Sequence, residues 1–362
     1  MLRVSQYIRK ALRKEIPKPI NGVILIWNLT NRCNLFCKHC YAFANSDKKD
    51  ELSLDEIKSI SEELRKEGVK FVILSGGEPL LREDIYDIAK ILKDKGFRIY
   101  LSTNGMLINE DNVKEIKRRF DYVGISIDGK QEVHDIFRGK RGAFKEAVKA
   151  LELCLSEGIK TGLRFTLTKL TKDSLDYVFR LVEHLGVPKI YISHIVFAGR
   201  GKKLSSPEKE EYKEIVKRIL LRAIYYVEHG KDIEVVTGNN ECDGILLLEL
   251  FSERYPEYGE YLYKGLKNWG GNSAGVRLVN IDHKGNVKPD PFFPMALGNL
   301  REKNFKEIWH ANGILSKLRE HPRKLKGKCS ECPYLKLCNG NSRARAYFAY
   351  GDLFEEDPLC YL

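Results

Sequence analysis

Three cysteines lie close together near the start of the chain, at Cys33, Cys37 and Cys40. They come soon after an apolar run, 23–27, which predicts a strand that leads into a cysteine-bearing loop. Three thiolates at this spacing can hold one soft metal ion or one iron–sulfur cluster. Because either centre needs four ligands, one position stays open for a small molecule. A structural zinc site with His39 as its fourth ligand is the alternative.

A second group of cysteines lies in the last part of the chain. Its members are Cys329, Cys332, Cys338 and Cys360. Four thiolates saturate a metal ion or a cluster, so this second site is predicted to be closed, with zinc as the alternative. Nine cysteines in all, an odd number with seven of them in two groups, favour metal or cluster binding over disulfides.

Six short apolar segments alternate with amphipathic helical segments between residues 22 and 198. The expected strands are 23–29, 69–75, 98–102, 122–127, 162–167 and 190–195. The expected helices are near 53–67, 83–95, 110–119, 142–157 and 173–185. Strands that are apolar almost throughout are typical of a parallel sheet with helical crossovers. Six units are too few for a closed eight-stranded barrel, so we predict an α/β fold with an open partial (βα)6 barrel.

Polar and glycine-containing segments follow the ends of these strands. Residues 76–79, 102–105 and 126–129 lie at the ends of the second, third and fourth strands, and Arg164 lies within the fifth. The carboxyl ends of parallel strands meet at one edge of the sheet. The sequence therefore predicts that these segments and the cysteine loop converge on one rim.

The rest of the chain divides by its change of pattern. We expect a short amphipathic helix at 1–21, the partial barrel at 22–198, a helical bridge at 199–269 and a small cysteine-rich α+β domain at 270–362. The bridge contains a long helix near 207–229. In the last domain, alternating apolar and polar residues around a Lys-Gly-Asn turn at 277–288 predict a hairpin, and a short helix is expected at 305–309.

The formal net charge is +12, from 62 Lys and Arg against 50 Asp and Glu. This balance suits an acidic partner or a polycarboxylate substrate, or else a surface rich in Lys–Glu pairs. The basic residues are scattered, which disfavours nucleic-acid binding. No apolar run is long enough to span a bilayer, and the N-terminus lacks a secretory signal. We therefore expect a cytoplasmic protein without a membrane partner.

The spacing of the first cysteine group, three residues and then two, resembles that of the radical S-adenosylmethionine (SAM) enzymes. The resemblance implies a 4Fe–4S cluster whose fourth iron is chelated by the amino and carboxylate groups of SAM. An electron passed through the cluster would cleave SAM to a 5′-deoxyadenosyl radical that abstracts hydrogen. A second motif of that family, which binds the methionine amino group, is matched by Gly76, Gly77, Glu78 and Pro79. Here the glycines allow close backbone approach, and Glu78 can accept from an ammonium group.

The same resemblance extends to further cofactor contacts. It implies Ser126 and Arg164 as candidates for the methionine carboxylate, and Asn104 and Asp128 as candidates for lining the SAM pocket. The C-terminal cysteines resemble the auxiliary-cluster module, of the SPASM type, found in some of these enzymes. This implies a second 4Fe–4S cluster that relays an electron or helps to fix the substrate.

Within that superfamily the chain resembles the tetrapyrrole branch, over residues 27–362. The segments that carry this resemblance are 271–275, 280–287, 289–290, 297–300, 338–341 and 351–362. It implies removal of two acetate side chains from 12,18-didecarboxysiroheme to give Fe-coproporphyrin III. The alternatives are removal of propionates in haem d1 synthesis and modification of a peptide or protein. Residues 340–342, Gly-Asn-Ser, depart from the Gly-Gly-Cys usual in the coprohaem decarboxylase of the same branch.

Four side chains are candidates for touching such a substrate, namely His39, Cys242, Arg343 and Arg345. The two arginines could bind carboxylates, or could instead pair with acidic residues at 355–357. His39 could equally pack against the cluster, and Cys242 could be a small buried hydrophobe, as we expect for Cys154. A small electron-transfer protein, such as a ferredoxin or flavodoxin, is the expected reductant.

Overall fold

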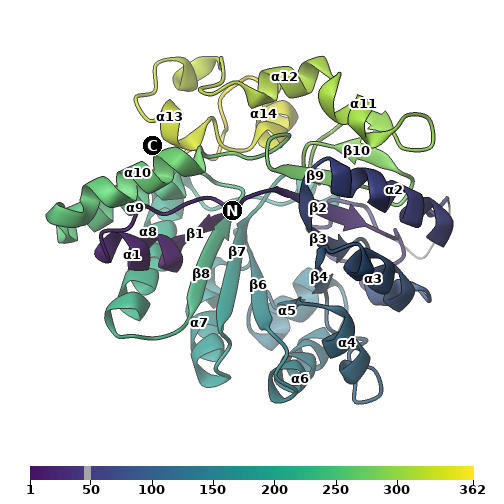
Figure 1. Ribbon diagram of the computed structural model, residues 1–362. Helices are drawn as coiled ribbons and strands as arrows, with labels where there is room; N and C mark the ends of the chain where they lie inside the picture. Colours follow the sequence, from purple (N-terminus) through teal and green to yellow (C-terminus); the bar gives the residue numbers. More distant parts are fainter. Residues whose placement is uncertain (45–49) are drawn as a thin grey trace.

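The computed structural model describes residues 1–44 and 50–362. Within them one sheet organises the chain, in the strand order β1-β8-β7-β6-β5-β4-β3-β2-β9-β10-β11. The strands are β1 Leu2–Arg3, β2 Val23–Asn28, β3 Val69–Ser75, β4 Arg98–Thr103, β5 Tyr122–Ser126, β6 Thr161–Leu167, β7 Lys189–His194, β8 Glu234–Gly238, β9 Leu278–Ile281, β10 Asn286–Lys288 and β11 Gly298–Asn299. Strands β2 to β8 run parallel and fan around a central space (Figure 1).

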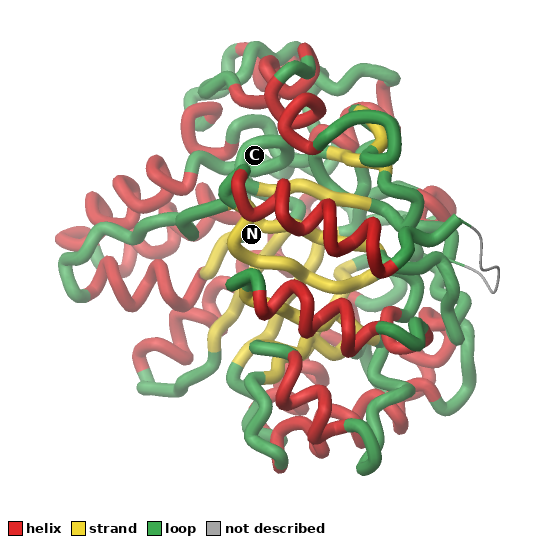
Figure 2. Tube along the Cα trace, turned by 45° about the vertical axis from the view of Figure 1, so that its right-hand side comes forward, coloured by secondary structure: helices red, strands yellow, loops and turns green. Residues whose placement is uncertain are grey.

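Helices cover the outside of this curved sheet, as both views show (Figures 1 and 2). The crossover helices are α2 Leu54–Lys66, α3 Ile85–Asp94, α4 Val113–Arg119, α5 Gln131–Arg138, α6 Ala143–Ser156 and α7 Leu175–His184. Helix α2 begins with a complete capping box, in which Ser53 and Glu56 satisfy each other's backbone N–H groups. Apolar residues of β2 to β7 and of these helices other than α5 form one core that includes the fully buried Trp27.

The α/β fold and each of the six predicted strands are present, displaced by one residue or less at most ends. The sheet nevertheless continues beyond them. Strand β8 pairs with β7 in parallel, and β9 pairs with β2 in parallel, so both edges of the predicted six-stranded unit are covered. Strand β8 lies inside the segment predicted as a purely helical bridge, and helix α5 was not predicted. Exposed parallel edges carry unpaired N–H and C=O groups, which these additions satisfy.

The N-terminal segment closes one side of the sheet. Strand β1 pairs antiparallel with β8, and helix α1, Val4–Leu12, packs against β8 and against two later helices, α8 and α10. The helices that follow the barrel are α8 Lys209–Glu228, α9 Asp243–Arg254 and α10 Gly259–Trp269. The predicted long helix near 207–229 therefore exists, and it shares its packing with the start of the chain.

The last part of the chain lies over the β2 side of the sheet and is drawn in yellow-green and yellow in Figure 1. The predicted hairpin is formed by β9 and β10, and β11 adds a third strand. Its helices are α11 Phe305–His310, α12 Gly313–Arg319, α13 Leu335–Cys338 and α14 Arg343–Tyr350. In the described part of the chain, none of the helices is both long and apolar enough to cross a membrane.

Two buried polar networks hold the C-terminal tail against the barrel. The Arg345 guanidinium donates to both carboxylate oxygens of Asp357 and to the carbonyl oxygen of Ile195, at 2.7 to 3.1 Å. The Tyr361 hydroxyl donates to Asp243 at 2.7 Å, and the other oxygen of that carboxylate meets His194 Nε2 at 2.7 Å. The tail is thereby joined to the end of β7 and to the start of α9.

We predict that Asp357→Ala destabilises the fold by about 3–5 kcal/mol, because the buried Arg345 guanidinium then has no counter-charge. Thermal unfolding of the two proteins would measure this. The matched control is Asp176→Ala, which breaks an exposed pair with Arg218 and should cost less than about 1 kcal/mol. Equal losses in the two variants would contradict the structural role of the buried pair.

Candidate active site

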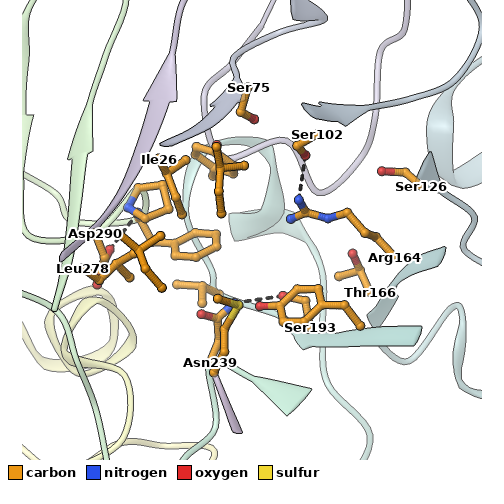
Figure 3. A pocket seen from close by; sticks show the side chains of 18 of the residues that line it. Ile26, Ser75, Ser102, Ser126, Arg164, Thr166, Ser193, Asn239, Leu278 and Asp290 are labelled. Carbon is orange, nitrogen blue, oxygen red and sulfur yellow. Dashed lines mark hydrogen bonds between the residues drawn. The ribbon is translucent and has the colours of Figure 1, made fainter. Parts of the chain in front are cut away.

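A cavity of about 470 Å³ fills the space enclosed by the sheet. Its upper end is formed by the loops at the carboxyl ends of the strands, and its lower end by the amino ends of β5 and β7. Figure 3 shows how side chains from β2 to β9 point into it. A volume of this size, enclosed by strands and partly apolar, is typical of sites for small molecules and cofactors.

Cys33, Cys37 and Cys40 all line the upper end of this cavity. Hydrogen bonds between backbones tie their loop to the end of α5, from Phe36 N to Arg138 O at 3.2 Å and from Lys38 N to Phe137 O at 2.9 Å. Burial is the main cause that raises the pKa of Cys33 to about 12, and the nearby thiols of Cys37 and Cys40 add to it. Three thiols held this close in a buried place favour a cationic centre that would take them as thiolates.

Arg138 supplies a fixed positive charge beside this loop. Its guanidinium forms a buried ion pair with Asp128 at 2.5 Å and lies 3.8 Å from the Cys37 sulfur. Asp128 was predicted to line the SAM pocket, but its side chain is fully buried outside the cavity. Its oxygens are used by Arg138 and by the backbone N–H of Thr166 at 2.7 Å, so that prediction is corrected. The residue positions Arg138, which does line the cavity.

The segment 76–79 approaches the cysteine loop closely. Gly76 and Gly77 line the cavity, and their backbone contacts that of residues 30–32, with Gly77 N donating to Thr30 O at 2.7 Å. A Cβ on Gly77 would stand 2.0 Å from the carbonyl oxygen of Arg32. Glycine is therefore required here by the approach of two backbones, as the sequence indicated.

Glu78 differs from its predicted role. Its carboxylate is fully buried and accepts from Thr103 Oγ1 at 2.8 Å, from Asn104 N at 2.8 Å and from Leu80 N at 3.2 Å. Burial raises the pKa of Glu78 to about 7, although these hydrogen bonds act in the opposite direction. The side chain thus joins the ends of β3 and β4 and does not reach the cavity as an acceptor for an ammonium group. Pro79, the last residue of the motif, opens a short turn and is buried outside the cavity.

Asn104, Ser126 and Arg164 line the cavity from three neighbouring strands, as predicted from their places at strand ends. Arg164 Nη1 donates to Ser102 Oγ at 2.7 Å, which Figure 3 shows, and the guanidinium lies over the Tyr191 ring. The Arg164 guanidinium is therefore held in one orientation at the wall of the cavity. Such a group binds a carboxylate well because its fork is already oriented.

His39 also lines the cavity, between two of the cysteines. Its ring stacks on Phe137 with 4.4 Å between ring centres and an angle of 3°. Nδ1 is buried without a hydrogen-bond partner among the described residues. Burial and the nearby cations hold the pKa of His39 well below its usual range, so the ring is neutral. A neutral ring fixed by stacking suits packing as well as contact with a bound molecule.

The lower end of the cavity carries functional residues that sequence reasoning missed. Arg3, Lys189 and Arg277 line it together with the tyrosines Tyr100 and Tyr122. Burial is the main cause that lowers the pKa of Lys189 to about 8, and its ammonium lies over the Tyr122 ring at 4.6 Å. No motif marks these cations, because they come from three distant parts of the chain. Only the formal excess of positive charge hinted at them.

The second group of cysteines, Cys329, Cys332, Cys338 and Cys360, lies in the C-terminal part of the chain, outside the cavity. Burial is the main cause that raises the pKa of Cys338 to about 12, and the thiols of Cys360, Cys329 and Cys332 contribute as close neighbours. The backbone N–H of Gly340 donates to the Cys338 sulfur at 3.3 Å. Four converging thiols with a backbone donor fit a closed 4Fe–4S site.

Three of the predicted substrate contacts lie elsewhere than in the cavity. Cys242 is fully buried beside Asn240 and Asn341, whose amide donates to its sulfur at 3.3 Å, and its thiol neighbours Cys360. Arg345 is used by Asp357, the alternative that the sequence left open. Arg343 is fully buried beside the second cysteine group. We therefore withdraw all three as substrate contacts.

Comparison with known proteins agrees with this geometry. A model of the radical SAM superfamily matches residues 27–182, and a model of the SPASM iron–sulfur cluster-binding domain matches residues 273–333. A pre-heme d1 synthase of Dinoroseobacter shibae is 39% identical over all of this chain and 92% of its own length. The chain belongs to the radical SAM superfamily. As a member it is an enzyme that uses a 4Fe–4S cluster and SAM, and its SPASM domain indicates an auxiliary cluster.

Two further relatives come from the archaeon Methanosarcina barkeri. An Fe-coproporphyrin III synthase is 38% identical over 94% of this radical SAM chain and 88% of its own length. An AdoMet-dependent heme synthase is 32% identical over 93% of this chain and 95% of its own length. Among solved structures, Streptococcus suis SuiB bound to SAM superposes with a TM-score of 0.73 at 17% identity, covering 94% of this chain and 78% of that one. That likeness confirms the fold.

We predict that Gly77→Ala lowers SAM affinity at least tenfold in this radical SAM enzyme, because the new methyl group would displace the cysteine loop from residues 76–79. Equilibrium dialysis with the reconstituted protein would measure it. Gly313→Ala is the matched control, since a Cβ there meets nothing within 4 Å. Unchanged SAM binding in Gly77→Ala would contradict the contact between the two loops.

Proposed function

We propose that this enzyme removes two acetate side chains from 12,18-didecarboxysiroheme and so forms Fe-coproporphyrin III. The observation that carries the proposal is a cavity with a cluster loop at one end and three cations, Arg3, Lys189 and Arg277, at the other, of which Arg3 also lies 3.8 Å from Glu234. A siroheme-derived macrocycle has a flat apolar ring with carboxylates at its edge. Its carboxylates suit Arg3, Lys189 and Arg277. Guanidinium and ammonium groups are the usual partners of carboxylates in proteins.

The walls between these two ends suit the ring itself. Apolar side chains from neighbouring strands line them, among them Ile24, Ile26, Phe71, Ile73 and Leu278. Contact with a flat apolar ring would remove these side chains from water, which is favourable in proportion to the buried area. The cavity thus has apolar walls and positively charged side chains at its lower end. A flat polycarboxylate fits this arrangement, whereas a simple peptide would not require it.

When bound, the cluster and SAM would supply a 5′-deoxyadenosyl radical. The residues of this chain would then position the reactants. Gly76 and Gly77 would let the backbone approach the methionine amino group, while Arg164 and Ser126 would face its carboxylate. Asn104 would complete that side of the pocket, because it lines the cavity and its amide donates to Asn34 at 2.7 Å. His39 is placed to contact either SAM or the substrate.

Removal of propionates in haem d1 synthesis is the second candidate, because the pre-heme d1 synthase is as similar as the Fe-coproporphyrin III synthase. The cations at the lower end of the cavity suit either substrate, since both carry carboxylates on one type of ring. Peptide or protein modification is the third candidate, and the likeness to SuiB bears on the fold alone. The departure at 340–342 disfavours the final decarboxylation of coprohaem.

The deciding experiment is a product assay under anaerobic conditions. The reconstituted enzyme is incubated with 12,18-didecarboxysiroheme, SAM and dithionite, and its products are identified by mass spectrometry. We expect the masses of a mono-deacetylated intermediate and of Fe-coproporphyrin III. Loss of propionate-derived mass would establish the haem d1 alternative, and an unchanged substrate alongside 5′-deoxyadenosine formation would overturn both tetrapyrrole proposals.

We predict a pH dependence that arises from the lower end of the cavity. Lys189 is charged below about pH 8 and neutral above it. Attraction for a substrate carboxylate is therefore present below pH 8 and is lost as the pH rises, so KM for the tetrapyrrole should increase. Lys189→Gln should raise KM several-fold at pH 7 and abolish this increase. Lys160→Gln, at an exposed lysine outside the cavity, should retain the wild-type profile.

We also propose that the reductant is a small acidic electron-transfer protein, such as a flavodoxin or ferredoxin, and that the enzyme works in the cytoplasm. The nine unpaired cysteines suit a reducing compartment. The outer face of the cluster loop supports the first point. Phe36, next to Cys37, is 62% exposed, and Ile136 of the adjoining α5 is 56% exposed. Exposed lysines at 38 and 140 flank this apolar surface.

We predict that the double variant Ile136→Asp with Lys140→Glu slows cluster reduction by flavodoxin at least tenfold, because it removes apolar contact and reverses charge. Reduction by dithionite should not change. Stopped-flow absorbance would follow both. The control variant, Leu221→Asp with Lys217→Glu, makes the same charge change on the outer face of α8. Equal slowing by the two variants, or equal slowing with dithionite, would refute docking at this face.

The division of the chain into four regions stays a proposal as well. The helix at 1–21, the barrel at 22–198, the bridge at 199–269 and the iron–sulfur domain at 270–362 share one sheet. Limited proteolysis of the loaded enzyme would test these boundaries.

A further inference from the structure

Arg343 is a buried cation whose hydrogen bonds are incomplete. Its side chain has no exposed surface. Nη1 donates to the carbonyl oxygens of Leu353 at 3.0 Å and Glu355 at 2.5 Å. Nε and Nη2 have no partner among the residues that the structure describes. A buried guanidinium with two unsatisfied nitrogens is costly, so it calls for a partner that binds there.

The neighbours of Arg343 indicate what that partner is. Its charge interacts most strongly with the Asp357 carboxylate, which Arg345 binds, and next with the thiols of Cys329 and Cys338, which belong to the second cysteine group. Gly340 lies next to Leu325 and the Arg343 guanidinium, since a Cβ on this residue would stand 2.2 Å from Leu325 Cδ1 and 3.1 Å from the Arg343 Nη2 atom. Gly340 therefore gives the guanidinium space on the side of Cys338, while its own N–H donates to the Cys338 sulfur.

The two other buried arginines of this region are fully used by the protein. Arg323 donates through Nε and both Nη atoms to four carbonyl oxygens and the Asn272 side chain. Arg345 donates through its three nitrogens to Asp357 and Ile195. Unsatisfied nitrogens are therefore not a general feature of arginines here, and they occur at the one that lies beside two predicted cluster ligands.

We infer that Arg343 donates hydrogen bonds from Nε and Nη2 to the sulfur atoms of the auxiliary 4Fe–4S cluster and raises its reduction potential. A 4Fe–4S cluster with four thiolates carries negative charge, which increases by one when it takes up one electron. A fixed cation and two N–H donors stabilise the more negative form more strongly, so reduction becomes easier. Arg343 is thus a residue that tunes the cluster and does not touch the substrate.

This inference rests on the auxiliary cluster and not on the tetrapyrrole proposal. Failure of the product assay would therefore leave it intact. Equally, a product assay that succeeds would not establish it, because Arg343 lies outside the cavity.

The test is a redox titration of the reconstituted protein with dithionite, followed by EPR, in which the SAM-binding cluster is the internal reference. In Arg343→Met we expect the ratio of reduced to oxidised auxiliary cluster at a given potential to fall at least tenfold, which is about 59 mV for one electron. Arg343→Lys keeps the charge and loses the fork, so its shift should be smaller. Lys328→Met removes an exposed charge beside Cys329 and should leave the potential unchanged.

An unchanged auxiliary potential in Arg343→Met would overturn the inference. If that variant does not retain the cluster, thermal unfolding of the metal-free chains decides. Without a cluster, a buried guanidinium with two unsatisfied nitrogens destabilises the fold. Arg343→Met should then unfold at a higher temperature than the wild type. Unfolding at a lower temperature would show that Arg343 serves the backbone of residues 353–355 alone, and would reject the inference.

Discussion

Compensation of buried negative charge is the constraint on which the rest of this structure depends. Each cysteine group brings buried and half-buried thiols together, and each has an arginine within reach. Arg138 lies beside Cys37 and is neutralised by Asp128, while Arg343 lies beside Cys329 and Cys338 without a carboxylate in hydrogen-bond contact. The difference fits two kinds of cluster site, one open to SAM and one closed by protein. The arginine beside the site of three thiolates is thus paired with a carboxylate, whereas the arginine beside the site of four thiolates is not hydrogen-bonded to one.

The parts of the fold that could be predicted from the sequence depend on local pattern. Continuous apolar runs gave the six strands, because a strand covered on both faces needs them along its whole length. The rim followed from the places of residues 76–79, 102–105 and 126–129 at strand ends. Strand β8 was missed because residues 234–238 stand alone after a long helix. Its pairing depends on an edge of β7 that no local pattern describes.

The parts of the site that could not be predicted depend on where side chains point. Glu78 and Asp128 stand in the expected loops, yet both turn into the protein to satisfy buried donors. Arg345 looked available because charged residues are usually exposed, and Asp357 twelve residues later takes its charge instead. Arg3 and Lys189 meet only in the folded sheet, so their joint effect at the lower end of the cavity has no signature in sequence.

The pairing of β1 with β8 has a consequence for how the protein is made. Residues 2–12 are synthesised before their partners in β8, α8 and α10, which follow roughly two hundred residues later or more. Until then their apolar side chains lack a binding surface, and the ribosome has already delivered most of the parallel strands. Contacts so distant in sequence form slowly. Arg3 therefore reaches the cavity only once β8 has been synthesised, long after the residues of the cysteine loop.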